Sequence, residues 1–280
     1  MTDPVNVLPS DLPLQCLYRW ERERGDDIFL TQPMGAGQVQ DITWTQAADQ
    51  ARRKAQGWPE GSRVAIIGKN SAHWILADLA ILMAGYVSVP IYPTFNGEAL
   101  AYILAHSEAR ACFVGKMDGV ENLQTGIPAD MPLITMPLAP MLKSLLWTDL
   151  LAHNAPLPGT PAPPMDALCT IIYTSGTTGK PKGVVQTFRA IAWALSSATR
   201  RVQMGDGERY ISYLPLAHVA ERMLIEQGVL HHGSRVFFAE SLDSFVQDLQ
   251  RARPTVFFSV PRLWVKFQQG VHHKMPAAKL

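Results

Sequence analysis

The segment Tyr173–Gly183 holds the densest group of residues that could bind an anion. It reads Tyr-Thr-Ser-Gly-Thr-Thr-Gly-Lys-Pro-Lys-Gly, so Ser and Thr hydroxyls, glycines and two lysines share one short loop. Glycines let backbone N–H groups approach an anion, hydroxyls donate to phosphate oxygens, and lysines neutralise the charge of a leaving phosphate. A solvated turn would not explain lysines beside a run of hydroxyls. The composition therefore predicts a polyphosphate-binding loop.

Three better-known catalytic motifs do not fit these residues. The common P-loop has four residues between its glycines and Ser or Thr after its lysine, whereas here two residues separate the glycines and proline follows Lys180. Ser175 lies outside the Gly-x-Ser-x-Gly pattern of hydrolase nucleophiles. The run His218-Val-Ala-Glu-Arg222 nearly matches the zinc pattern His-x-x-Glu-His, but arginine stands at the second histidine position. Taken alone, His218 reads as a core or turn histidine.

The overall composition is that of a globular protein without a strong electrostatic field. Hydrophobic residues make up 47% of the 280 residues, which is enough apolar material for a core. Lys and Arg number 25 against 24 Asp and Glu, a net charge of +1. No overall basic field therefore exists to hold nucleic acid, and we expect no nucleic-acid partner.

Cysteine usage and the N-terminus indicate the compartment. Cys16, Cys112 and Cys169 are far apart and form no Cys-x-x-Cys pair, which disfavours a disulfide framework or a zinc ribbon. The N-terminus carries acids and prolines where a signal peptide needs a basic start and an apolar run. The most apolar stretch, 74–93, is interrupted by polar residues, glycine and prolines, so it reads as buried core rather than a transmembrane segment. We therefore expect a cytoplasmic protein.

The first half of the chain alternates short apolar strands with helices. Apolar runs flanked by turn residues predict strands at 63–67, 87–91 and 111–114. Helices are expected from 41 to 55, closing at Gly57, from 72 to 84 after a cap at Asn70 or Ser71, and from 98 to 107. Strands and helices of these lengths in alternation predict an α/β fold of layered parallel sheets with flanking helices.

Residues 154–164, with five prolines in eleven positions, are the best candidate boundary in the chain. We expect 1–153 to form a first α/β sheet layer and 165–280 to form a second, incomplete layer that carries the phosphate loop. Strands are expected at 167–173, 183–186, 210–214, 235–239 and 255–259, and helices at 188–200, at 244–251 and from Pro261. The adjacent pairs His231-His232 and His272-His273 read as surface residues.

The loop Tyr173–Gly183 resembles the phosphate-binding loop of the adenylate-forming superfamily, which includes acyl-CoA synthetases, luciferases of the firefly type and peptide-synthetase adenylation domains. Other segments are similar to further family motifs in the same order: Thr43-Trp-Thr-Gln, Leu82-Met-Ala-Gly-Tyr-Val-Ser-Val-Pro-Ile91 and Ser212-Tyr-Leu-Pro-Leu-Ala-His-Val-Ala-Glu-Arg222. The last, with Thr255-Val-Phe-Phe-Ser-Val-Pro-Arg-Leu-Trp264, resembles long-chain fatty acyl-CoA synthetases. The resemblance runs from about Phe29 onward.

This resemblance implies that a carboxylate attacks the α-phosphorus of ATP, and that coenzyme A then displaces AMP. By position, the β- and γ-phosphates would be held by Thr174, Ser175, Gly176, Thr177, Thr178, Gly179 and Lys180. Thr174 or Thr177 would help to place Mg²⁺. His218 and Lys180 would be the catalytic residues, with His218 steering the carboxylate. Val260 and Trp264 would border the acyl chain.

The sequence departs from the family in length. It has no Tyr-Gly-x-Thr-Glu segment and no Thr-Gly-Asp segment after His218, and no C-terminal domain. We therefore expect an incomplete N-terminal AMP-binding domain with little or no activity alone. Two alternatives stay open. The chain could be a catalytically dead or partner-dependent nucleotide-binding scaffold, whose partner chain supplies the missing half, or an acyl-AMP ligase serving a carrier protein. Long-chain relatives work near membranes, so peripheral membrane contact also stays open.

Overall fold

The computed structural model describes residues 6–53, 57–174, 179–202 and 205–274. Its larger sheet has seven strands in the order β7-β6-β5-β3-β4-β8-β9. All neighbouring strands in it run parallel except β8 and β9, which form an antiparallel pair. The strands are β3 (Arg63–Ile67), β4 (Val87–Ile91), β5 (Ala111–Val114), β6 (Leu133–Thr135), β7 (Leu145–Leu146), β8 (Leu168–Thr174) and β9 (Lys182–Thr187).

The smaller sheet has four strands in the order β10-β11-β1-β2. They are β1 (Ile28–Gly35), β2 (Gln38–Thr43), β10 (Arg209–Ser212) and β11 (Arg235–Phe238). β1 pairs with β11 in parallel and with β2 in an antiparallel hairpin. An early strand and a late strand therefore share one sheet, while β8, from beyond the proline-rich segment, pairs with β4. The expected division of the sheets into 1–153 and 165–280 is wrong, because strand pairing crosses residues 154–164 in both sheets.

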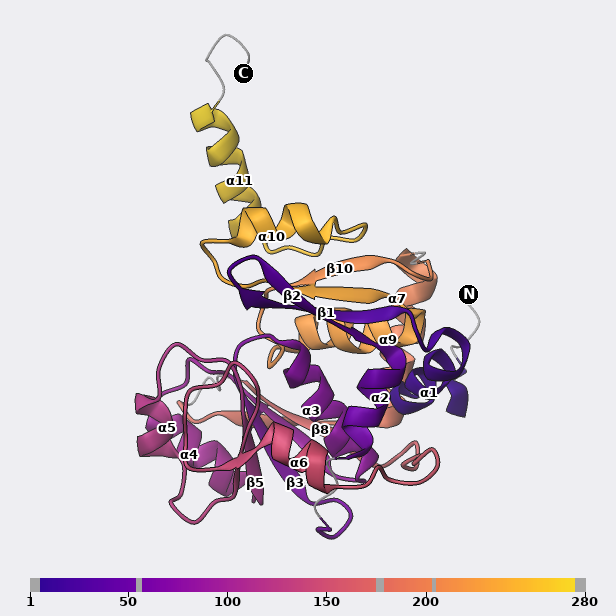
Figure 1. Ribbon diagram of the computed structural model, residues 1–280, viewed down its shortest axis with the longest axis vertical. Coiled ribbons are helices and arrows are strands. Elements are labelled where there is room, and N and C mark those ends of the chain that lie inside the picture. Colours follow the sequence, from indigo (N-terminus) through magenta and orange to yellow (C-terminus); the bar gives the residue numbers. More distant parts are fainter. Residues whose placement is uncertain (1–5, 54–56, 175–178, 203–204, 275–280) are drawn as a thin grey trace.

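Helices fill the space between the sheets and cover their outer faces (Figure 1). They are α1 (Pro13–Arg24), α2 (Trp44–Arg52), α3 (Ala72–Met83), α4 (Gly97–His106), α5 (Glu121–Gly126), α6 (Trp147–His153), α7 (Phe188–Val202), α8 (Val219–Glu221), α9 (Gly228–His232), α10 (Phe245–Ala252) and α11 (Pro261–Lys274), with a 3-10 turn η1 (Pro9–Asp11) and a π-helical turn η2 (Arg222–Gln227). No helix of the described residues is long and apolar enough to cross a membrane.

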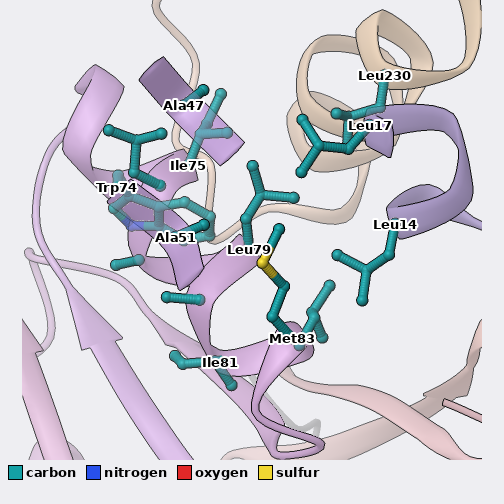
Figure 2. Close-up of a cluster of buried hydrophobic side chains, with 14 of the residues drawn as sticks. Leu14, Leu17, Ala47, Ala51, Trp74, Ile75, Leu79, Ile81, Met83 and Leu230 are labelled. Atoms are coloured by element: carbon teal, nitrogen blue, oxygen red, sulfur yellow. The ribbon is translucent and has the colours of Figure 1, made fainter. Parts of the chain in front are cut away.

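The main core lies between the two sheets and surrounds α3. Every residue of α3 is buried, as expected for a helix that is apolar on nearly all faces. Figure 2 shows Ile75 and Leu79 of this helix among side chains from three other helices: Leu14 and Leu17 of α1, Ala47 and Ala51 of α2, and Leu230 of α9. The strands divide their side chains between faces, so Val64 and Ile66 of β3 join this core while Ala65 and Ile67 join a second core under α4 and α5.

Three local predictions are wrong. The strand expected at 255–259 is not formed, because its backbone pairs with β10 only at its start, where the N–H of Thr255 donates to the carbonyl of Arg209 over 2.9 Å. The helix expected from residue 41 is α2 and begins at Trp44, because residues 41–43 belong to β2 and Thr43 caps the helix. His232 is buried, since its Nε2 lies 2.9 Å from the hydroxyl of Thr199 beneath α7.

Candidate active site at the carboxyl ends of β4 and β8

The predicted phosphate loop follows β8 directly. Thr174 is the last residue of β8 and is exposed, whereas Tyr173 before it is buried. The predicted ligands Ser175, Gly176, Thr177 and Thr178 lie outside the described residues. The chain is described again from Gly179, whose φ of +90° is a left-handed conformation that favours glycine. Lys180 is exposed, with its Nζ 5.5 Å from the centre of the Tyr102 ring.

Two aromatic contacts attach this loop to α4. The Tyr173 hydroxyl lies 2.7 Å from Nδ1 of His106, the last residue of α4. Tyr102, one turn earlier on α4, stacks on the His106 ring at 5.3 Å between centroids. Tyr173, the first residue of the loop, and Lys180 therefore both contact the C-terminal half of α4. Burial raises the pKa of Tyr173, with a smaller contribution from Tyr102, so the phenol stays protonated at neutral pH.

His218 lies on the loop between β10 and α8 and serves as the N-cap of α8. Its Nδ1 accepts a hydrogen bond from the N–H of Ala220 over 3.1 Å. In the neutral imidazole this bond leaves the proton on Nε2. The His218 ring meets the ring of Tyr92 edge to face at 6.4 Å between centroids. Because Tyr92 directly follows β4, His218 lies over the carboxyl end of that strand.

The phosphate loop and His218 therefore lie at the ends of neighbouring strands. β4 and β8 pair in parallel, so their carboxyl ends meet at one edge of the larger sheet. The sequence predicted both elements as site residues without any information that β4 and β8 are neighbours. This edge of an open parallel sheet is the usual position of a ligand site in α/β proteins.

A cavity of about 230 Å³ opens between the ends of the two sheets, and Pro215 of the loop that carries His218 lines it. Its walls come from the segments that follow β3, β4, β5, β10 and β11, and they include Asn70, Thr94, Lys116, Ser212, Tyr213, Pro215, Glu240 and Phe245. Burial, reinforced by neighbouring Lys69, lowers the pKa of Lys116. The ammonium of Lys116 donates to the carbonyl of Glu240, which links the larger sheet to the smaller one.

Glu221 and Asn70 hold the loop that carries His218, and sequence reasoning missed both roles. Oε1 of Glu221 accepts hydrogen bonds from the Ser212 hydroxyl over 2.9 Å and from the Tyr213 N–H over 3.0 Å. In the sequence, Asn70 has the pattern of a helix cap, and Glu221 appears only in the incomplete zinc pattern His218-Val-Ala-Glu-Arg222. Burial raises the pKa of Glu221 to about 8, partly offset by the hydrogen bond from Ser212.

Arg222, the next residue, forms a fully buried ion pair with the middle of α3. Its guanidinium donates to both carboxylate oxygens of Asp78, over 2.7 and 2.6 Å, and lies 3.4 Å from a carboxylate oxygen of Glu226. Burial raises the pKa of Glu226, with a further contribution from Asp78. The turn that follows α8 is thus joined to α3 by a buried charged contact.

The predicted acyl-wall residues lie in a separate aromatic cluster. Trp264 of α11 is 52% exposed and packs edge to face on Phe257 and Phe267, at 5.6 and 5.9 Å between centroids. Phe257 stacks on Tyr213, which lines the cavity. Val260 precedes α11 and is 37% exposed. The cluster therefore meets the cavity through Tyr213.

The described part of the chain holds no group of three or more His, Cys, Asp or Glu side chains placed to bind a metal. Its three cysteines are free and buried, and burial raises the pKa of each thiol. A nucleophilic role for these three cysteine side chains is therefore disfavoured, since the reactive form of cysteine is the thiolate.

The family model for "AMP-binding enzyme" matches residues 17–279, and the chain belongs to that family. It is 28% identical over 95% of its length to the long-chain-fatty-acid–CoA ligase ACSBG2 of Xenopus laevis, covering 39% of that relative. It is 33% identical over 77% of its length to the peroxisomal long chain acyl-CoA synthetase 6 of Arabidopsis thaliana, covering 32% of it. The chain thus spans well under half of the length of these relatives.

Solved structures share the fold. The anthranilate CoA ligase AuaEII, in complex with anthranoyl-AMP, matches with a TM-score of 0.76 and 18% identity over 90% of this chain and 51% of its own. A benzoate CoA ligase from Burkholderia xenovorans matches with a TM-score of 0.76 and 23% identity over the same shares. The fold is therefore that of the N-terminal domain of adenylate-forming enzymes, as the sequence predicted.

Proposed function

We propose that this chain carries the phosphate-binding and acid-binding half of an AMP-forming acid–thiol ligase that acts on long-chain fatty acids. The observation that carries the proposal is that Thr174 and His218 lie at the carboxyl ends of the neighbouring strands β8 and β4, in a chain of the AMP-binding family. The names of its relatives support a fatty acid as the substrate and coenzyme A as the thiol.

The reaction has two steps. A carboxylate oxygen attacks the α-phosphorus of ATP, so that a C–O–P bridge forms and pyrophosphate leaves. The sulfur of coenzyme A then attacks the acyl carbon, and AMP leaves with the bridging oxygen as the thiol proton is released. Both steps depend on positioning and on stabilising charge that develops on oxygen.

The described loop residues fit a polyphosphate. Thr174 is exposed at the end of β8, and a side-chain atom at Gly179 would meet nothing within 4 Å, so backbone can approach a ligand there. Lys180 is exposed and supplies a mobile positive charge. In the proposal these residues, with Ser175, Gly176, Thr177 and Thr178, hold the β- and γ-phosphates. Mg²⁺ takes its oxygens mainly from phosphate, with Thr174 or Thr177 adding a hydroxyl.

His218 is proposed to orient the carboxylate. Its Nδ1 is occupied by the Ala220 N–H, which leaves Nε2–H as the donor toward a substrate oxygen. Val260 and Trp264 are proposed to border the acyl chain on the far side of Tyr213. Turnover by these 280 residues is expected to be slow, because the sequence has no Tyr-Gly-x-Thr-Glu or Thr-Gly-Asp segment to bind AMP.

The test is fatty-acid-dependent exchange of labelled pyrophosphate into ATP, at high protein concentration. A Thr177→Ala, Lys180→Ala double variant should lose the exchange. Lys143→Ala, which removes an exposed lysine between β6 and β7, should retain it. Circular dichroism confirms that each variant is folded. Exchange that is equal in the two variants would contradict the assigned role of the loop.

Two further measurements separate the alternatives. Binding of Mg·ATP that depends on Lys180, without any exchange, would favour a nucleotide-binding scaffold or a chain that needs a partner. With exchange established, coenzyme A and a phosphopantetheinyl carrier protein are compared as thiol acceptors. Acyl transfer to the carrier alone would identify an acyl-AMP ligase that serves a carrier protein.

A further inference from the structure

We infer that Asn70 and Glu221 are positioning residues that set the placement of His218 over the carboxyl end of β4. The inference rests on the proposed function, since it gives His218 its role there. It concerns two buried side chains that meet at the Ser212 hydroxyl of the loop 212–218, one from the segment that follows β3 and one from the helix that follows His218.

Asn70 uses both ends of its amide on this loop. Its Nδ2 donates to the Ser212 hydroxyl over 2.7 Å and to the Leu214 carbonyl over 2.5 Å. Its Oδ1 accepts from the Leu216 N–H over 3.0 Å. Asn70 itself sits between β3 and α3 and is 8% exposed. One side chain of the larger sheet therefore fixes the path of the loop two residues before His218.

Glu221 closes the arrangement from the other end. Its Oε1 accepts from Ser212 and Tyr213, and lies 3.3 Å from Nδ2 of Asn70. Because Glu221 is three residues after His218, the loop on both sides of the histidine is tied to the same buried group of polar atoms. Buried hydrogen bonds of this kind are rigid, since breaking one leaves a polar group without water or partner.

The arrangement explains how two separate sheets can share one site. His218 follows β10 of the smaller sheet, yet its ring meets Tyr92, which follows β4 of the larger sheet. Within the described residues, Asn70 supplies the direct link between the end of β3 and the backbone of this loop. Loss of the link should let His218 move relative to β4 without altering the phosphate loop after β8.

The variants Asn70→Ala and Glu221→Ala test the inference, with Asn96→Ala as the matched control. Asn96 also accepts a backbone hydrogen bond at a helix start, from Ala99 over 2.9 Å, but it caps α4 and does not touch the loop. The activity-independent readout is the imidazole NMR signal of His218, assigned from its loss in His218→Gln. We expect this signal to shift or broaden in both test variants and to stay in place in Asn96→Ala.

Fatty-acid-dependent exchange of pyrophosphate into ATP supplies the second readout. In Asn70→Ala the KM for the fatty acid should rise about fivefold or more, while the KM for Mg·ATP stays within about twofold of the wild-type value. The reason is that, in the proposed function, His218 contacts the fatty-acid carboxylate and not the nucleotide. A general loss of structure would raise both. An unmoved His218 signal, or equal changes in the two KM values, would overturn the inference. Absence of exchange in the wild-type chain would instead overturn the proposed function and leave the NMR readout to decide the inference.

Discussion

The phenol of Tyr173 and the imidazole of His106 are joined by a hydrogen bond of 2.7 Å, so the strand that enters the phosphate loop is fixed to the end of α4. The two rings meet edge to face at 5.8 Å between centroids. Lys180, at the far end of the loop, lies over Tyr102 on the same helix. The loop is therefore attached to α4 on both sides, and α4 helps to determine where a polyphosphate could be held.

Tyr173→Phe should weaken both stability and nucleotide binding. Loss of one buried hydrogen bond lowers the free energy of unfolding by about 1 kcal/mol. The loop also loses an anchor, so affinity for Mg·ATP should fall. Tyr86→Phe is the control, since the Tyr86 hydroxyl accepts from the Trp58 N–H over 2.7 Å far from the loop. Urea unfolding and ATP titration measure the two effects, and an equal change in ATP affinity in both variants would disprove the anchoring role.

Arg222→Met should be strongly destabilising, whereas Arg189→Met should have little effect. Both arginines donate to both carboxylate oxygens of an aspartate, but the Arg222–Asp78 pair is buried and the Arg189–Asp166 pair is exposed. Removing Arg222 leaves a buried carboxylate without its partner, which costs about 3–5 kcal/mol. The free energy of unfolding in urea tests the contrast. Similar losses in the two variants would show that burial does not set the difference.

Glu221 should make the protein less stable as pH rises. Its carboxyl binds a proton more tightly in the folded state than in the unfolded state, because burial raises its pKa from 4.5 to about 8. Between these pH values the folded chain holds a proton that the unfolded chain has released, so the contribution to the free energy of unfolding falls with rising pH. Glu221→Gln removes this effect. The stability of the variant relative to wild type should therefore increase from pH 4.5 to about 8.

Urea unfolding of wild type and Glu221→Gln across this pH range supplies the measurement. The difference between the two should level off at either end of the range. A difference that stays constant with pH would mean that Glu221 has the same pKa in both states.

Gly233→Ala should destabilise the protein more than Gly37→Ala. Gly233 ends α9 in a left-handed conformation with φ of +60°, and a Cβ there would lie 2.6 Å from the Trp20 ring. Gly37 has a φ of +78° but open space around its Cα. Both variants carry backbone strain of about 1 kcal/mol, and only Gly233→Ala adds a steric clash with a buried ring. Melting temperatures test the order, and equal shifts would contradict it.

The elements with strong local signals were predicted closely. β4 and β5 have the predicted bounds, because short apolar runs between turn residues admit little else. The start of α3 was expected after a cap at Asn70 or Ser71, and Ser71 is the cap, since its hydroxyl accepts a hydrogen bond from the Trp74 N–H. The phosphate-binding role of Tyr173–Gly183 stays a prediction, because the central residues of this loop lie outside the described part of the chain.

The contacts between distant segments could not be predicted. The pairing of Leu30 with Val236, more than two hundred residues apart, leaves no trace in the local periodicity of either strand. The contacts of Asn70 and Glu221 with the loop 212–218 could not be predicted either. By residue type alone, Asn70 is an ordinary helix cap and Glu221 an ordinary solvated acid. The strand expected at 255–259 failed for a related reason, since a strand needs a partner along its whole length and the backbone of this segment bonds to β10 only at Arg209.

The most direct test of the central claim follows the carboxylate oxygen. The chain is incubated at stoichiometric concentration with Mg·ATP, coenzyme A and a fatty acid labelled with ¹⁸O in its carboxyl group, and the AMP is analysed by mass spectrometry. Attack of the carboxylate on the α-phosphorus predicts AMP that carries one ¹⁸O atom, and Thr177→Ala, Lys180→Ala should abolish it. Label in inorganic phosphate, or AMP that forms without label, would contradict the account.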